Sequence, residues 1–398
     1  MAPAPKPRGG TAAGPATPAL PDEAYLAAAA GLPAMGPHRL LTLFQAYGAK
    51  GVWRQASSGR VPDLPELDGR LGKDPVSLVR RWAHAAEQVD VGDAWARHLA
   101  QGITGAVLGS PHYPAALAHD PEPPAIVFLR GHPAVLDGPR VAVVGTRNCT
   151  RVGREVATEL GRELAAAGVR VVSGLALGID GAAHLGALAA AADEPEAAPP
   201  VAVVAGGLDV VYPRRHADLH RQVERAGVLV SEAPLGIRPE PWRFPARNRI
   251  IAGLADAVVV VESRISGGSM HTADEAIARG TTLLAVPGSV RSPASAGTNA
   301  LLAAGATVVC DIDDVLVAIG RGGARRPSPG ASAVRSRGST DPIAQVVLEA
   351  LGWEPLTFEQ LVARTCLDMA PVASQVASLE AAGLLVRSDG WLERTLES

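Results

Sequence analysis

The chain has 398 residues, 47% of them hydrophobic and 19% charged, which is ordinary for a soluble globular protein of two or three domains. Its formal net charge of −3 excludes a polycation, so any nucleic-acid site must be a local patch. Because no run of about 18 uncharged apolar residues occurs, a membrane span is excluded as well.

Residues 1–20 are rich in Pro, Ala and Gly and contain no apolar stretch, so they indicate a flexible tail and not a signal peptide. The three cysteines, Cys149, Cys310 and Cys366, have no C-x-x-C spacing. So few cysteines without that spacing argue against a disulfide framework or a structural zinc site and favour a reducing compartment. We therefore expect a cytoplasmic protein.

Residues 21–105 predict a small helical domain of the helix-hairpin-helix or SAM-like kind. The segment 31–40 lies between two apolar helical stretches and is similar to the turn of a helix-hairpin-helix, in which Gly36 would let the backbone approach a partner. A tight turn inside a small helical bundle accounts for the same residues equally well.

Residues 106–318 change to short valine-rich runs that alternate with amphipathic stretches such as 152–167 and 269–279. Continuous apolar strands alternating with helices indicate a parallel sheet that is covered on both faces. We therefore predict a Rossmann-like, doubly wound, mainly parallel α/β domain, with residues 189–200 as a loop. The expected strands are 141–144, 169–172, 201–205, 228–230, 257–261 and 282–286.

Residues 319–340 predict a linker rich in Gly, Ser, Pro and Arg. It contains five arginines and no acidic residue, which suits either a solvated tether or transient phosphate contact. The arginines are Arg321, Arg325, Arg326, Arg335 and Arg337.

Residues 341–398 have the element order of a winged helix. Helices are expected over 343–351, from Thr357, whose capping box uses Gln360, and from Pro371 to just before Gly383. Strands at 384–387 and 391–393 flank a turn. Nine acidic residues against three arginines give the segment a charge of −6, so it is expected to contact protein and not duplex DNA.

Glycine turns follow three of the predicted strands, around Gly145, Gly174 and Gly206. At the first turn, backbone N–H groups of a helix start predict an anion site, to which Arg147 adds a phosphate contact. At the second, Asp180 is expected to cap the following helix. Because the carboxyl ends of parallel strands meet at one edge, the turns predict one continuous crevice. A complete G-x-G-x-x-G fingerprint is absent, which disfavours NAD binding.

The segment 242–251 combines arginines with an aromatic residue where a loop enters a helix. Arg247 and Arg249 suit phosphate oxygens, Asn248 suits sugar or base, and Phe244 offers a face for base stacking. In the alternative interpretation Phe244 only packs the helix start. A further helix start, from residue 267, follows the next strand.

The ordered motifs resemble the DprA/Smf (DNA-processing protein A) family. They are Val-Gly-Thr-Arg (144–147), Ser-Gly-Leu-Ala-Leu-Gly-Ile-Asp (173–180), Gly-Leu-Asp-x-x-Tyr-Pro (207–213) and Phe-Pro-Ala-Arg-Asn-Arg-Ile-Ile (244–251), with Gly-Ser-Met-His-Thr-Ala (268–273) after them. The resemblance covers about residues 24–398. It implies single-stranded DNA binding, a homodimer formed through the Rossmann domain, and loading of RecA recombinase onto DNA coated by single-strand binding protein, in transformation and recombination.

Two positions depart from this pattern: Leu177 replaces a basic residue that some relatives have, and His271 lies in a motif that is commonly more apolar. The residues and the resemblance together give an expected DNA-binding site. It comprises Gly145, Thr146, Arg147, Ser173, Gly174, Gly178, Gly206, Phe244, Arg247, Asn248, Arg249, Gly268, Ser269 and Thr272.

We expect no catalysis and no cofactor, because the sequence contains no metal cluster and no nucleophile–base pair. The absence of lysine after Lys73 excludes a P-loop ATPase. One enzymatic alternative is a nucleotide-processing protein of the lysine-decarboxylase-like (LOG) group, in which Glu275 would be the acid/base. A transcription regulator acting through the winged helix is opposed by that segment's charge.

Overall fold

The computed structural model describes residues 19–394 except 68, 323–340, 353–354 and 389. The chain divides into two compact units, Met1–Arg325 and Arg326–Ser398, and each is described by itself. The expectations of a flexible tail at 1–20 and of a linker at 319–340 lie almost entirely outside the described residues. No helix in the described part is long and apolar enough to cross a membrane.

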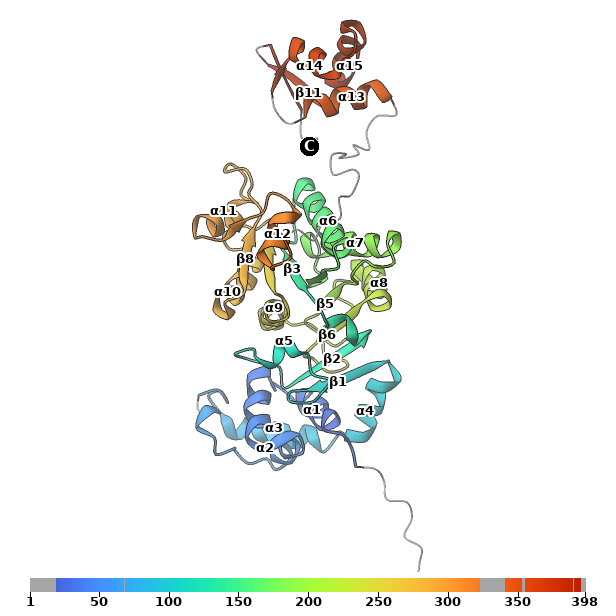
Figure 1. The fold of residues 1–398 in the computed structure, drawn as a ribbon. Coiled ribbons are helices and arrows are strands. Elements are labelled where there is room, and N and C mark those ends of the chain that lie inside the picture. The colour runs from blue at the N-terminus through green and yellow to red at the C-terminus, as the bar shows by residue number, and fades with distance from the viewer. Residues whose placement is uncertain (1–18, 68, 323–340, 353–354, 389, 395–398) are drawn as a thin grey trace, which may run out of the picture. The chain divides into compact units, whose positions relative to one another are not determined.

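Within its described residues, the larger unit is built on a nine-stranded sheet in the order β1-β2-β6-β5-β4-β3-β7-β8-β9 (Figure 1). The strands from β6 to β9 in this order pair in parallel, whereas β1 and β2 are antiparallel. The strands are β1 (Ile103–Val107), β2 (Ile126–Gly131), β3 (Arg140–Val144), β4 (Arg170–Ser173), β5 (Val201–Val203), β6 (Val228–Ser231), β7 (Ala257–Val260), β8 (Thr282–Ala285) and β9 (Thr307–Val308).

This strand order confirms the predicted doubly wound sheet. The chain proceeds outward from β3 through β4, β5 and β6 in one direction, then returns to β7 beside β3 and proceeds through β8 and β9 in the other. Open α/β sheets bind ligands where the strand order reverses, outside the carboxyl ends of the strands. The site is therefore expected at the ends of β3 and its neighbours.

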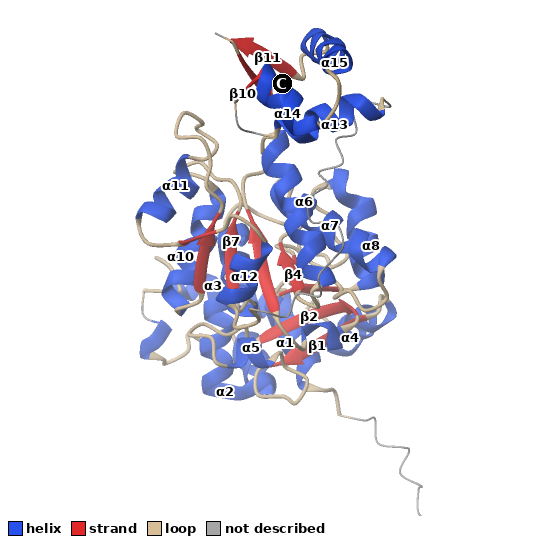
Figure 2. Ribbon diagram, turned by 45° about the horizontal axis from the view of Figure 1, so that its top comes forward, coloured by secondary structure: helices blue, strands red, loops and turns tan. Residues whose placement is uncertain are grey.

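Helices cover both faces of the sheet (Figure 2). Alternate residues of a strand point to opposite faces, so Val141 and Val143 pack with α6 and α7, and Ala142 and Val144 pack with α9 and α10. The helices are α5 (Ala115–Ala118), α6 (Arg151–Ala166), α7 (Ile179–Asp193), α8 (Ala217–Ala226), α9 (Arg243–Leu254), α10 (Gly268–Arg279), α11 (Ala296–Ala303) and α12 (Ile312–Ala318), with 3-10 turns η2 (Pro133–Leu136) and η3 (Arg214–His216).

The helices before the sheet pack directly onto its β1–β2 end and share a core with it. Phe128 of β2 shares one buried core with Leu26 and Trp95, and the ring of His98 stacks between Trp95 and Phe128. The boundary expected at residue 105 therefore crosses a continuous core. These elements are α1 (Asp22–Ala30), α2 (Pro37–Ser57), η1 (Pro65–Leu67), α3 (Pro75–Ala86) and α4 (Val91–Ala100).

The smaller unit has the expected winged-helix order and its own apolar core. Its described residues form α13 (Pro342–Leu351), β10 (Leu356–Thr357), α14 (Phe358–Thr365), α15 (Met369–Ala381), β11 (Leu385–Ser388) and β12 (Trp391–Arg394). The capping box of Thr357 and Gln360 is present at the start of α14. Two local expectations were wrong: α15 begins at Met369 and not at Pro371, and α7 continues to Asp193 into the segment assigned to a loop.

Candidate nucleic-acid interface

The turn after β3 is held tightly against the next turn of the sheet. The Thr146 N–H donates to the backbone oxygen of Glu262, at 2.7 Å. A Cβ at Gly145 would lie 2.5 Å from Cγ1 of Ile179 and 2.9 Å from the same Glu262 oxygen, so only glycine fits. Gly145 and Thr146 therefore shape the turn through their backbone.

The carboxylate of Glu262 occupies the N-terminus of α6. It accepts hydrogen bonds from the backbone N–H of Thr150, at 2.8 Å, and from the Thr150 hydroxyl, at 2.9 Å. Its side chain is buried, and a Cβ at Gly153 would lie 2.7 Å from its Oε2. The helix start in which the sequence predicts a phosphate is thus filled by the protein's own carboxylate, which makes the same favourable interaction with the helix dipole.

A second internal carboxylate, Asp180, fills the turn after β4. Its Oδ2 accepts from the Gly174 N–H at 3.1 Å, so Asp180 does not cap its own helix as expected. Burial raises the pKa of this carboxyl, whereas Arg247 and the backbone N–H groups of Gly174, Gly145 and Ala176 act to lower it. Both anion-binding turns are therefore satisfied from within the fold.

Arg247 is buried beneath these turns. Its Nη1 donates to the backbone oxygen of Gly174, at 2.9 Å, and to that of Val203. Burial lowers the pKa of the guanidinium to about 10, with Asp180 opposing the shift and Arg147 adding to it. A Cβ at Gly174 would overlap this guanidinium, which explains the glycine at that position.

Arg249 lies on another side of α9 and forms a buried ion pair. Its Nη2 is 2.6 Å from both carboxylate oxygens of Glu232, and its Nη1 donates to the backbone oxygen of Glu122. The two charged side chains are 8% and 11% exposed. The expectation that Arg249 presents its guanidinium to phosphate is not met, because the ion pair with Glu232 holds it inside the protein.

The crevice predicted at the ends of β3, β4 and β5 is present. Arg147 from the first turn lies 4.8 Å from the centroid of the Phe244 ring, and the Tyr212 ring lies 5.6 Å from Phe244 at 52°. We call this cavity of about 470 Å³ the phenylalanine pocket. It is lined by Arg147, Gly174, Ala176, Leu177, Val204, Ala205, Gly206, Val210, Tyr212, Pro213, Pro239, Phe244 and Arg247.

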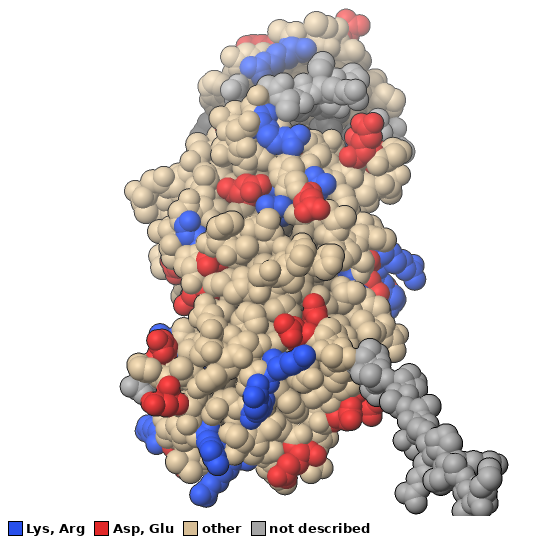
Figure 3. All heavy atoms as spheres, turned by 60° about the horizontal axis from the view of Figure 1, so that its bottom comes forward, with Lys and Arg blue, Asp and Glu red and all other residues tan. Residues whose placement is uncertain are grey.

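The exposed cation of this pocket is Arg147. No hydrogen bond or ion pair is recorded for its side chain among the described residues, in contrast to Arg247 and Arg249. Tyr212 is 48% exposed and lines the pocket, although the sequence analysis does not include it in the expected site. The face drawn in Figure 3 mixes basic and acidic side chains and shows no single large basic patch.

Several expected contacts lie in the interior or outside the pocket. The Ser173 hydroxyl donates to the Val143 oxygen at 2.7 Å, the Ser269 hydroxyl donates to that of Ser263 at 2.8 Å, and Thr272 is buried. Three further residues of the expected site do not line the pocket. Gly178 turns the chain with a φ of 81°. The Nδ2 of Asn248 donates to the backbone oxygen of Gly268 at 3.4 Å.

The acidic residues near the crevice are engaged in structural contacts. Glu275, the acid/base residue of the enzymatic alternative, pairs with Arg279, which also binds Asp120 at 2.7 Å. In the described part of the chain, no group of three or more His, Cys, Asp or Glu side chains could hold a metal ion. His184 is completely buried, as a packed histidine would be.

Comparison with known proteins agrees with this architecture. The family model of DNA recombination-mediator protein A matches residues 105–320, and the DprA winged helix domain matches residues 331–390. A DprA-type DNA processing protein of Mycobacterium tuberculosis is 42% identical over 277 residues, covering 67% of this chain and 68% of that protein. DNA processing protein DprA of Bacillus subtilis is 36% identical over 221 residues, covering 55% and 72% of the two chains.

The X-ray structure of DprA from Streptococcus pneumoniae matches with a TM-score of 0.60 at 30% identity, covering 74% of this chain and 96% of that one. The doubly wound sheet, the arginine and aromatic side chains at its carboxyl edge and the winged helix define a Rossmann-like protein of the DNA-processing class. The chain belongs to the DNA recombination-mediator protein A family, whose members carry the names DprA and Smf.

Proposed function

We propose that this protein binds single-stranded DNA in the phenylalanine pocket. The observation that carries the proposal is the stack of Arg147 on Phe244 beside Tyr212, in a cavity that is lined mainly by apolar residues. Two aromatic rings offer faces to bases, and the unpaired guanidinium offers donors to a phosphate. Bases in a duplex are stacked on each other and cannot reach such rings, so the chemistry favours a single strand.

We infer that Arg147 is the principal phosphate contact of the pocket. The internal carboxylates at the helix starts and the burial of Arg247 and Arg249 support this assignment, because they leave Arg147 as the exposed guanidinium. The other residues of the expected site, including Gly174, Gly178 and Gly206, are proposed to shape the crevice through the backbone.

The test is a titration of fluorescent oligothymidylate at several salt concentrations. Arg147→Ala should weaken binding and flatten the slope of log K against log salt by about 0.7, the value for one phosphate on a single strand. Phe244→Ala should weaken binding by about 1–3 kcal/mol for each stacked base, whatever the base. Arg162→Ala is the matched control, because Arg162 is exposed on α6 and does not line the phenylalanine pocket.

Wild-type affinity and an unchanged salt slope in both variants would refute the assignment of the pocket. Duplex DNA of the same length serves as the second probe and should bind less tightly than the single strand. Arg247→Ala is a poor test, since it would leave Asp180 buried without its charge partner.

We also propose that the protein acts as a cytoplasmic recombination mediator that loads RecA onto the bound strand, as a homodimer and on DNA coated by single-strand binding protein. The family description supports mediation. Exposed apolar side chains near the outer edge of the sheet, Ile277 at 61% and Val308 at 45%, suit a dimer contact. RecA filament assembly on coated DNA should accelerate with the wild-type protein and not with Phe244→Ala.

The same proposal holds that the protein is not an enzyme. The acids of the crevice are committed to Thr150, Gly174, Arg249 and Arg279, so none is placed as a free acid/base. Purified protein should leave DNA, ATP and nucleoside monophosphates intact with or without magnesium. Release of free base from a monophosphate, abolished by Glu275→Gln, would establish the enzymatic alternative instead.

A further inference from the structure

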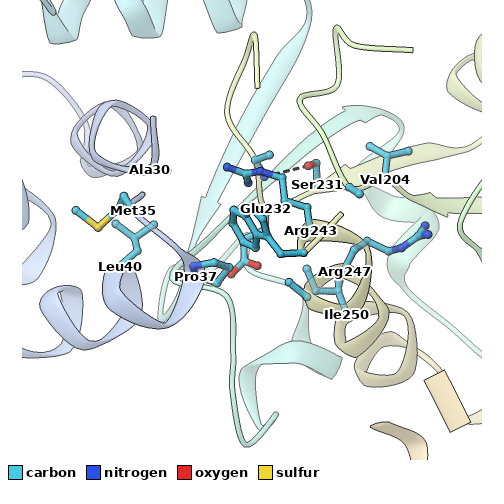
Figure 4. Close-up of a pocket in the computed structure, with 14 residues that line it drawn as sticks. Ala30, Met35, Pro37, Leu40, Val204, Ser231, Glu232, Arg243, Arg247 and Ile250 are labelled. Carbon is cyan, nitrogen blue, oxygen red and sulfur yellow. Dashed lines mark hydrogen bonds between the residues drawn. The ribbon is translucent and has the colours of Figure 1, made fainter. Parts of the chain in front are cut away.

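A second cavity, here called the junction pocket, lies where the α1–α2 turn meets α9. It encloses about 430 Å³ including its open mouth. Met35, Pro37 and Leu40 form the wall on the helical side, and Arg243 and Arg247 come from α9 opposite them (Figure 4). The pocket therefore joins the helices before the sheet to the helix that carries Phe244.

The junction pocket adjoins the phenylalanine pocket. Val204, Ala205 and Arg247 line both cavities, so the two share a wall at the end of β5. Trp242 and Arg243 line the junction pocket, and Phe244, the next residue, lines the phenylalanine pocket. The two pockets therefore lie next to each other along α9.

The side chains of the junction pocket suit a nucleotide. Trp242 is 44% exposed, and the Arg243 guanidinium lies 4.3 Å from its ring centroid. The Nε of Arg247 is buried and has no hydrogen-bond acceptor among the described residues. The Nε of Arg243 is buried as well and has no hydrogen bond there, although it forms an ion pair with Oε2 of Glu240 at 3.9 Å. Buried donors are nearly always paired in native proteins, so an acceptor is expected here. A base against Trp242 and the apolar wall, with its phosphate near Arg243, provides both ring contact and acceptor.

We propose that the junction pocket is a second nucleotide subsite, which receives the part of the DNA strand next to the nucleotides held at Phe244. This inference rests on the proposed function of the phenylalanine pocket. In this proposal the α1–α2 turn, with Met35 and Pro37, forms the outer wall of the DNA-binding path. The helices before the sheet are then part of the DNA site.

The experiment measures affinity against the length of oligothymidylate, from about four to about twelve nucleotides. Trp242→Ala and Arg243→Ala remove the ring and the charge. Ala246→Leu fills the pocket, because Ala246 lines only this cavity. The controls are Ala278→Leu, an exposed alanine on α10, and Arg162→Ala. Thermal melting checks that each variant is folded, and Trp242→Phe keeps a ring should Trp242→Ala unfold.

The junction variants should bind the shortest oligonucleotides like wild type and should lose about tenfold in affinity for longer ones, the loss of one stacked base. Trp242→Phe should restore most of that loss. Equal affinity of wild type and all junction variants at every length, with Phe244→Ala still impaired, would overturn this inference and leave the phenylalanine pocket in place. If Phe244→Ala and Arg147→Ala are also without effect, the proposed function itself fails.

Discussion

Arg247 and Arg249 are two residues apart on α9 and have different environments. Neighbouring helical positions diverge by about 100°, so Arg247 reaches the ends of β4 and β5, while Arg249 reaches Glu232 after β6. The sequence predicts an arginine-rich segment at the crevice but cannot tell which guanidinium is exposed. The deciding partners, Gly174 and Glu232, are 73 and 17 residues away along the chain.

Because Arg249 forms a buried ion pair, we expect its substitution to lower the stability of the protein more than its affinity for DNA. Arg249→Ala would leave Glu232 buried without a partner, which costs about 3–5 kcal/mol in buried pairs. Urea denaturation should show this loss, whereas Arg147→Ala should unfold like wild type. Equal stability of the Arg147 and Arg249 variants would contradict the structural role of the pair.

His184 predicts a pH dependence of stability. Burial lowers its pKa to about 3, so the folded state keeps the ring neutral while the unfolded chain takes up a proton near pH 6.5. The free energy of unfolding therefore decreases as the pH falls below about 6.5, by up to about 1.4 kcal/mol per pH unit. When the pH falls from about 7 to about 5, the free energy of unfolding of His184→Leu should decrease by about 2 kcal/mol less than that of wild type.

Denaturation at the two pH values measures this difference. His271→Gln, which changes an exposed histidine, is the control and should follow the wild-type curve. If the free energy of unfolding changes with pH in the same way for wild type and His184→Leu, then His184 has the same protonation in the folded and the unfolded protein.

At the scale of elements, the parallel core could be predicted because its central strands are short, buried, valine-rich runs, as in β3, β5, β6 and β7. The observed β3 and β7 agree with the expected ranges to within one residue at each end. β1 was missed because Gly105 interrupts an already short strand, and β9 because it has only two residues, Thr307 and Val308. β1 is defined by its pairing with β2, which the sequence analysis did not predict either, and β9 by its pairing with β8.

The start of α6 predicts that Glu262 stabilises the turn after β3. Glu262→Ala removes the acceptor of both Thr150 bonds, and we expect a loss of about 1–3 kcal/mol from the unpaired groups. Glu262→Gln keeps one acceptor oxygen and should lose less. Thermal or urea unfolding of the two variants gives the ranking, and a larger loss for the glutamine variant would contradict it.

At the scale of the whole molecule, the helices before the sheet share a core with its β1–β2 end. Phe128 and Ile126 of β2 are almost fully buried beneath them. A hydrophobic pattern shows that such residues are buried, but it does not show which element covers them. This is why the sequence predicted a boundary where the structure has a shared core.

The acidic winged helix predicts that single-strand affinity does not depend on it. A chain ending at Thr340 lacks nine carboxylates that repel phosphate and should bind oligothymidylate at least as tightly as the full chain. A chain ending at Gly320 also lacks most of the arginine-rich linker, so comparing the two isolates the linker's contribution. A large loss of affinity on ending at Thr340 would show that the winged helix touches DNA despite its charge.

The carboxylates of Glu262 and Asp180 also bear on whether free nucleotides can bind at the two turns. Rossmann-like folds commonly hold the phosphates of free nucleotides at these turns, and ATP is abundant wherever recombination proceeds. Here both positions are occupied from within. We therefore expect millimolar ATP to compete poorly with oligothymidylate for the crevice.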